Sequence, residues 1–294
     1  MNYRILLVDQ AGSGMQDMLG HTIWQEYGFE ITGRTPNADG AVTALQQHDF
    51  DMLLCIHRPA ERTAVETLSR LQQKHIDAPA VVVSLEDDSV CMRQCFLYGA
   101  LDFLIEPLRD EDIRHALQRA TELLDRRLMN EEYNTALDYA LSNLNGKNSA
   151  VMEKLREFML TSREQTVTTE SAAEFFGFNR DYFSRYFKRN TGAAFSEFHK
   201  DFMMEYARLL LSGGHFKVHE VSDILGFSSA DYFSRIFKRR TGRSPSEFRK
   251  PGNPGDAGNS GCSARQPSAW SAACPLPPAA DSGGLRVPSC GGAS

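Results

Sequence analysis

Short apolar runs recur along the first 110 residues and alternate with amphipathic segments. The runs lie at residues 5–8, 29–32, 52–56, 80–83 and 103–105. Strands that are buried on both faces of a parallel sheet have such continuous apolar stretches. The segments between them show helical spacing near residues 15–27, 38–47, 61–74 and 87–98. The pattern predicts an α/β doubly wound domain, whose functional crevice lies at the carboxyl ends of the strands.

A long helix is predicted from Asp110 onward. Apolar residues keep helical spacing at Ile113, Leu117, Ala120 and Leu124, and the period resumes at Leu137, Leu141 and Leu144. The period falters around residues 126–134. Two interpretations stay open: a helix that ends the first domain, or a coiled-coil connector that pairs two protomers through the first four of these residues.

The pattern over residues 151–250 predicts short helices only. The same residues contain an internal repeat. Asp181–Arg189 recurs as Asp231–Arg239, and 14 of 20 positions are identical between residues 181–200 and 231–250. Each copy has a short helix, a turn at Gly177 or Gly226, and a second helix. This arrangement predicts two helix-turn-helix units.

The second helix of each copy combines aromatic core positions with a charged face. Phe183 and Phe187, like Phe233 and Phe237, lie at i and i+4 and should face the core. The residues expected to bind DNA are Arg180, Asp181, Ser184, Arg185, Lys188, Arg189, Ala230, Asp231, Ser234, Arg235, Lys238 and Arg239. Guanidinium groups suit contacts to guanine, and ammonium groups neutralise phosphates. The same pattern in two copies argues against a merely solvated face.

The acidic member of each face has two interpretations. Asp181 and Asp231 precede Arg185 and Arg235 by four residues. They either orient these arginines by i, i+4 pairing or accept a hydrogen bond from cytosine, and we favour orientation.

Residues 221–249 carry a family signature. It comprises Gly226-Phe227, Asp231-Tyr232-Phe233-Ser234-Arg235, Phe237-Lys238, Gly242, Pro245 and Phe248-Arg249. The signature resembles that of AraC/XylS-type transcription regulators, and the resemblance covers residues 151–250. It implies two helix-turn-helix units joined by a longer helix near residues 195–211. It also implies recognition helices that enter successive major-groove faces of double-stranded promoter DNA.

The first 127 residues resemble the receiver domain of two-component response regulators. The matching pieces are Ile5–Asp9, Phe50–Leu54, Val83-Ser84, Gly99–Leu104 and Pro107. A receiver of flavodoxin-like fold phosphorylates a carboxylate at the end of its third strand. It also needs acidic residues that hold Mg²⁺ after the first strand and a lysine after the fifth.

The resemblance fails at the residues that carry this chemistry. We expect a degenerate pocket formed by Asp9, Gln10, Cys55, Ser84, Phe103 and Glu106. Cys55 stands where the phosphoacceptor aspartate is expected and Glu106 where the lysine is expected. A thiol gives no acyl phosphate, and Glu106 would repel a phosphoryl group. We therefore expect a receiver that is not phosphorylated by the usual chemistry, with phosphorylation by an unusual route as the alternative.

Charge and cysteine usage fit a control module joined to a nucleic-acid module. Residues 1–150 carry a net charge of −10 and residues 151–250 a net charge of +4. The six cysteines have no zinc-site spacing, so we expect reduced structural thiols, no metal and no cofactor. The sequence shows no membrane span or signal peptide, and we expect a cytoplasmic protein.

We predict a DNA-binding transcription regulator that is not an enzyme, with a homodimer and RNA polymerase contact as further expectations. The expected domains are residues 1–127 for the receiver, 128–150 for a helical linker and 151–250 for the DNA-binding domain. Residues 251–294 are expected to be a disordered tail, and a reading-frame artefact is left open. The alternative from another class is an interaction scaffold with vestigial DNA binding.

Overall fold

The computed structural model describes residues 3–10, 22–47, 50–58, 62–145, 148–163 and 165–249. The expected tail at residues 251–294 and the part of the first expected helix before Thr22 lie outside this range.

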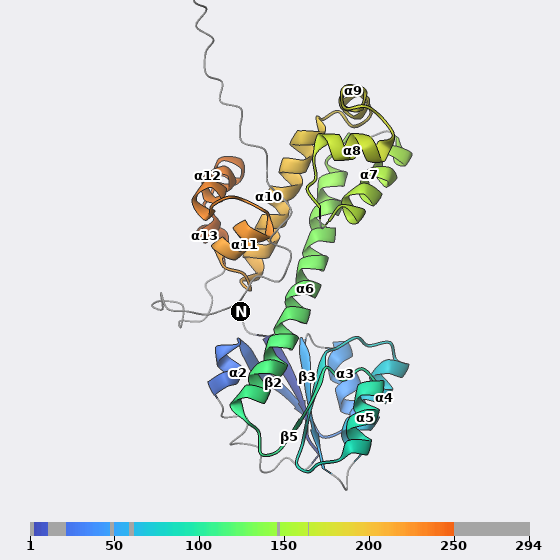
Figure 1. Ribbon diagram of the computed structural model, residues 1–294, viewed down its shortest axis with the longest axis vertical. Helices are drawn as coiled ribbons and strands as arrows, with labels where there is room; N and C mark the ends of the chain where they lie inside the picture. Colours follow the sequence, from blue (N-terminus) through green and yellow to red (C-terminus); the bar gives the residue numbers. More distant parts are fainter. Residues whose placement is uncertain are drawn as a thin grey trace, which may run out of the picture.

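The first domain contains one five-stranded parallel sheet (Figure 1). Its strands are β1 (Tyr3–Val8), β2 (Phe29–Thr35), β3 (Met52–His57), β4 (Ala80–Ser84) and β5 (Asp102–Ile105), in the order β2-β1-β3-β4-β5. The doubly wound prediction is therefore confirmed. Because all strands are parallel, their carboxyl ends meet along one edge of the sheet.

Helices cover both faces of this sheet. They are α2 (Thr22–Glu26), α3 (Ala38–Gln47), α4 (Thr63–Gln73), α5 (Ser89–Leu97) and α6 (Asp110–Ser142). The α2 and α6 helices pack on the face that carries Leu54 and Ile56, whereas α4 and α5 pack on the face that carries Leu53 and Cys55. Successive residues of β3 thus enter opposite cores, as the twofold alternation of a strand requires.

The first half of α6 belongs to the receiver core. Ile113, Leu117 and Ala120 have no exposed surface, and Leu124 is 7% exposed. All four pack with residues of the sheet. The hypothesis that they pair two protomers as a coiled coil is therefore wrong, because their apolar face is already covered within the chain.

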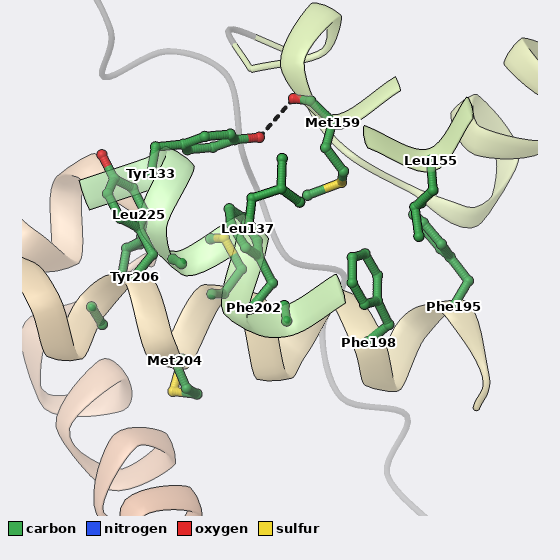
Figure 2. Packing of buried hydrophobic residues seen from close by; sticks show 14 of the residues in the cluster. Tyr133, Leu137, Leu155, Met159, Phe195, Phe198, Phe202, Met204, Tyr206 and Leu225 are labelled. Atoms are coloured by element: carbon green, nitrogen blue, oxygen red, sulfur yellow. Dashed lines mark hydrogen bonds between the residues drawn. The ribbon is translucent and has the colours of Figure 1, made fainter. Parts of the chain in front are cut away.

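The second half of α6 continues without a break into the other domain. The region expected as a linker is helical to Ser142, and Tyr133, Ala136, Leu137 and Ala140 pack in the second domain's core. Tyr133 donates a hydrogen bond of 2.7 Å to the carbonyl of Met159, and its ring centroid lies 4.9 Å from that of Phe202 (Figure 2). One helix therefore contributes to both cores.

The regular secondary structure in the described residues of the second domain is all helical, as predicted. Its helices are α7 (Ser149–Thr161), α8 (Thr169–Phe176), α9 (Arg180–Thr191), α10 (Phe195–Gly213), α11 (Val218–Ile224), α12 (Ala230–Thr241) and α13 (Pro245–Phe248). Helix α10 runs between the α8–α9 unit and the α11–α12 unit (Figure 1). None of the helices in the described ranges is both long and apolar enough to cross a membrane.

Candidate nucleic-acid interface and strand-end pocket

The two helix-turn-helix units are built by the same local interactions. Gly177 and Gly226 end the first helix of each unit at φ values of 76° and 72°, a left-handed conformation that favours glycine. Asn179 and Ser229 cap the second helices, and their side chains accept hydrogen bonds from the third residue that follows each cap. The repeat in the sequence is therefore a repeat in backbone geometry.

The aromatic residues of both second helices anchor them to the core. Phe183, Phe187, Phe233 and Phe237 have no exposed surface, which confirms the predicted i, i+4 core face. The side chains around each helix are thereby fixed in direction, and the opposite face is left to solvent.

The charged residues predicted to contact DNA lie on these exposed faces. Exposed residues in the two units are Arg180, Asp181, Ser184, Arg185, Lys188, Arg189, Asp231, Arg235, Lys238 and Arg239. Ala230 and Ser234 are half-buried. Arg180 is partly engaged, because its Nε lies 2.9 Å from the Glu170 carboxylate. The two helices thus present matching cationic surfaces.

The structure does not show the orienting role that we favoured for Asp181 and Asp231. No ion pair within the described ranges joins Asp181 to Arg185 or Asp231 to Arg235. Instead, Arg185 Nε donates a hydrogen bond of 3.3 Å to the backbone carbonyl of Asp181. The carboxylates of both aspartates therefore stay exposed beside the basic residues.

Arg240 fixes the second unit to the helix between the units, a role that the sequence analysis missed. Its guanidinium lies 2.7 Å from Glu197 and 2.6 Å from Asp201, both on α10. The hydrogen bond from Arg240 lowers the pKa of the Glu197 carboxyl. Asn190 stands at the equivalent place in the first copy, so the repeat itself did not point to this role.

Cys55 was expected at the end of the third strand. It lies two residues before that end. Its side chain has no exposed surface and packs in an apolar cluster. Burial raises the pKa of the thiol to about 12.

His57 occupies the strand end in place of Cys55. It is the last residue of β3 and is paired in register with Ser84 on β4. Its ring centroid lies 6.4 Å from that of Phe103 on β5. Ser84 is buried, and its hydroxyl donates a hydrogen bond of 2.6 Å to the carbonyl of Glu86. His57, which was not among the expected site residues, thus lies at the strand end beside Ser84 and Phe103.

The remaining pocket residues already have partners within the chain or face solvent. Asp9 Oδ1 lies 2.7 Å from Arg58 Nη1, and the two side chains are 8% and 16% exposed. The amide oxygen of Gln10 accepts a hydrogen bond of 2.8 Å from Thr63. Glu106 is exposed.

These residues do not fit the Mg²⁺ ion that receivers use. Mg²⁺ needs free carboxylate oxygens, but the carboxylate of Asp9 is paired with the Arg58 guanidinium. The neighbouring Gln10 carries no charge, and His57 stands at the strand end. A hard divalent cation would have to compete with an arginine for a single carboxylate.

Family comparisons agree with this architecture. Residues 5–118 match the family described as response regulator receiver domain, and residues 172–251 match the family described as helix-turn-helix domain. The chain thus has the architecture of a response regulator with a helix-turn-helix DNA-binding domain, of the type that regulates transcription.

Individual relatives are similar at low identity. An uncharacterized response regulatory protein of Staphylococcus epidermidis is 22% identical over 233 residues, which cover 77% of this chain and 90% of that protein. The uncharacterized HTH-type transcriptional regulator YijO of Escherichia coli is 30% identical over 81 residues, 28% of this chain and 29% of that protein. The C-terminal domain of the response regulator yesN from Fusobacterium nucleatum gives a TM-score of 0.32 at 26% identity, over 34% of this chain and 99% of that one.

Proposed function

We propose that the exposed faces of α9 and α12 bind specific promoter sites on double-stranded DNA, and that the receiver takes part in this regulation without phosphorylation by the usual chemistry. The observation that carries the proposal is the duplicated recognition surface. Arg185 and Arg235 take equivalent places on two helices that are capped, turned and anchored alike.

The arrangement of the two units supports contact with successive major-groove faces. Helix-turn-helix proteins place the second helix of each unit in the groove, and residues near its N-terminus contact base edges. Arg185 and Arg235 lie in the second turn of α9 and α12. Lys188 and Lys238 follow three residues later and are suited to phosphates. The net charge of +4 over residues 151–250 favours DNA in the same way.

The strand-end pocket supports a receiver that works without an aspartyl phosphate. Its strand-end residue is His57, its one acidic residue after β1 is paired with Arg58, and Glu106 stands before the proline. A phosphoryl group would find neither a carboxylate acceptor at this strand end nor a lysine.

Two partners belong to the proposal as well. Paired DNA sites would favour a symmetric homodimer, and a promoter-bound regulator would lie within reach of RNA polymerase. Because Ile113, Leu117 and Ala120 are buried in the receiver, the dimer has to use a different surface.

Binding of the full chain to the promoter fragment beside its own gene tests the DNA proposal. Fluorescence anisotropy would compare the wild type with the double variant Arg185→Ala/Arg235→Ala. Loss of two base contacts at about 1–3 kcal/mol each should weaken specific binding by one to four powers of ten. Arg114→Ala, which removes an exposed arginine from α6, is the matched control. Unchanged affinity in the double variant would contradict this interface, and no promoter binding by the wild type would favour the scaffold alternative.

A further inference from the structure

Four side chains with metal-binding chemistry meet where β3 ends and α5 begins. His57 is the last residue of β3, Asp88 is the N-cap of α5, and Cys91 and Cys95 lie one turn apart on α5. Ligand atoms of His57, Asp88 and Cys91 all lie within 4.8 Å of one another. The sulfur of Cys95 lies 3.7 Å from that of Cys91. The cluster thus brings one nitrogen, one oxygen and one sulfur donor within 4.8 Å of one another, and a second sulfur lies beside that of Cys91.

The spacing of these donors approaches that of a tetrahedral zinc site. Zinc bonds of about 2.0 Å to nitrogen or oxygen and about 2.3 Å to sulfur place neighbouring ligands about 3.3–3.8 Å apart. His57 Nε2 and Asp88 Oδ2 are 3.3 Å apart, and the two sulfurs are 3.7 Å apart. The histidine–aspartate pair and the Cys91 thiol are separated by up to 4.8 Å. Zinc binding would draw His57, Asp88 and Cys91 closer together, and Cys95 would have to turn toward the same point.

The burial of the cluster supports a site rather than a chance contact. His57 is 3% exposed, Cys91 5% and Cys95 0%. Asp88 keeps 31% of its side chain exposed, which gives an ion a path from solvent.

We propose that His57, Asp88, Cys91 and Cys95 bind one zinc ion and thereby fasten the end of β3 to α5. Thiolate and imidazole ligands select zinc over Mg²⁺ and Ca²⁺, which prefer oxygen. Two ligands at i and i+4 on one helix face are a known way to hold zinc. The site adjoins the strand-end pocket, because His57 pairs with Ser84 in the sheet. It is independent of the proposed DNA contacts.

Zinc binding at this site releases protons. Burial raises the pKa of both thiols, so each carries a proton at neutral pH. Binding replaces the two Sγ protons by the metal, while the Asp88 carboxylate and a ring nitrogen of His57 each donate a lone pair. The positive charge of Arg62 lowers the pKa of the Cys91 thiol, whereas the negative charge of Asp88 raises it.

Cobalt substitution in the full chain tests the site. Cys262, Cys274 and Cys290, which lie outside the described residues, are replaced by serine in every variant so that they add no thiolate. A chelator-treated and reduced sample is titrated with Co²⁺. We expect one Co²⁺ per chain, a thiolate-to-cobalt charge-transfer band and tetrahedral visible bands. Zn²⁺ should displace Co²⁺ and abolish these bands, whereas excess Mg²⁺ should not.

Variants within this background decide which residues are ligands. Cys91→Ser and His57→Gln should each weaken cobalt binding at least 100-fold. Asp88→Asn keeps the helix cap and should weaken binding less. Cys55→Ala is the matched control, because it removes a buried thiol of the same core without touching the four donors. Circular dichroism identifies any variant that does not fold, and at least one folded ligand variant is required.

The proposal is overturned by any of three results. These are no charge-transfer band at micromolar Co²⁺ in the background chain, a band that survives Cys91→Ser, or a band lost equally in folded Cys55→Ala. DNA affinity measured on the same samples without metal separates these results from a failure of the DNA interface.

Discussion

The guanidinium of Arg58 lies 2.7 Å from the carboxylate of Asp9, at the edge of the sheet where the parallel strands end. The two residues come from different strand ends and are both largely buried. An arginine thus supplies the positive charge that a divalent cation supplies in a phosphorylated receiver. This ion pair balances the charge of Asp9 within the chain.

Acetyl phosphate should leave the protein unmodified. We expect no mass increase of one phosphoryl group after incubation with acetyl phosphate and Mg²⁺, because the pocket lacks a carboxylate at the strand end. A receiver with an intact acidic pocket serves as the positive control in the same buffer. A phosphoryl group mapped by mass spectrometry to residues 1–127 would contradict this prediction.

Cys55→Asp should also remain unphosphorylated and should be destabilised. It places a carboxylate at a strand position with no exposed surface, two residues before the strand end. The expected loss in the free energy of unfolding is about 2–5 kcal/mol in urea denaturation. Cys55→Ala is the comparison that keeps the site apolar, and its loss should be smaller.

Removing Arg58 should destabilise the receiver by leaving Asp9 unpaired. We expect Arg58→Ala to lower the free energy of unfolding by about 2–4 kcal/mol, since both side chains are mostly buried. The double variant with Asp9→Asn should recover part of this loss. Arg109→Ala is the matched control, because Arg109 pairs with Asp112 at the exposed surface and should contribute about 0–1 kcal/mol. An equal loss in the free energy of unfolding for Arg58→Ala and Arg109→Ala would contradict the role given to the buried Arg58–Asp9 pair.

The strands were predictable, whereas the residue at a strand's end was not. An apolar run marks a strand because both of its faces are buried, and this placed all five strands. The run in β3 stops at Ile56, so nothing in the pattern showed that the polar His57 still belongs to the strand. The thiol of Cys91 comes close to His57 only in the folded chain, so no spacing along the chain could reveal the cluster.

Helical periodicity showed which face of α6 is apolar but not what covers it. The same spacing serves a coiled coil and a helix that packs on a sheet, and Leu117 follows the second case. In the repeat, by contrast, the anchoring phenylalanines were predictable, because two copies repeat the same i, i+4 pair. The Arg240 contacts with α10 were not, because they join residues about 40 apart.

Leu117→Ala should reduce stability without changing the oligomeric state. Leu117 has no exposed surface in the receiver core, so truncation should cost about 2–5 kcal/mol in urea denaturation. The molar mass from light scattering should match that of the wild type. Leu97→Ala is the control, because that side chain is 70% exposed. Dissociation of a dimer by Leu117→Ala with unchanged unfolding would restore the coiled-coil hypothesis.

Low pH should lower the free energy of unfolding of the DNA-binding domain, because it favours protonation of His199. Its ring is stacked between Phe195 and Phe202, and burial lowers its pKa from 6.5 to about 4. Between these values the unfolded chain binds a proton that the folded chain does not. The stability contributed by neutral His199 is thus complete above pH 6.5 and is lost as the pH falls towards 4, by about 3 kcal/mol.

Urea unfolding at pH 7, 5.5 and 4.5 measures this effect. His199→Leu should flatten the pH dependence over this window, whereas His219→Gln, which alters an exposed ring, should follow the wild type. A slope that His199→Leu leaves unchanged would assign the acid sensitivity to other groups.

Removing the arginine and removing the lysine on α12 should weaken DNA binding in different ways. Arg235 lies in the second turn of the helix and Lys238 three residues later, and both are exposed on the face opposite Phe233. Arg235→Ala should weaken binding to the preferred site by about 1–3 kcal/mol and relax specificity at one or two base pairs. Lys238→Ala should weaken all sequences alike and flatten the salt dependence by about one unit of slope.

Binding of each variant to the preferred site and to random DNA, over a series of salt concentrations, distinguishes these roles. Arg185→Ala and Lys188→Ala repeat the comparison on α9, where the same two residues stand at the same places. A base contact loses affinity only for the preferred sequence, because random DNA never made it. If Arg235→Ala weakens both DNAs equally, Arg235 holds a phosphate and the recognition face of α12 has been assigned to the wrong residues.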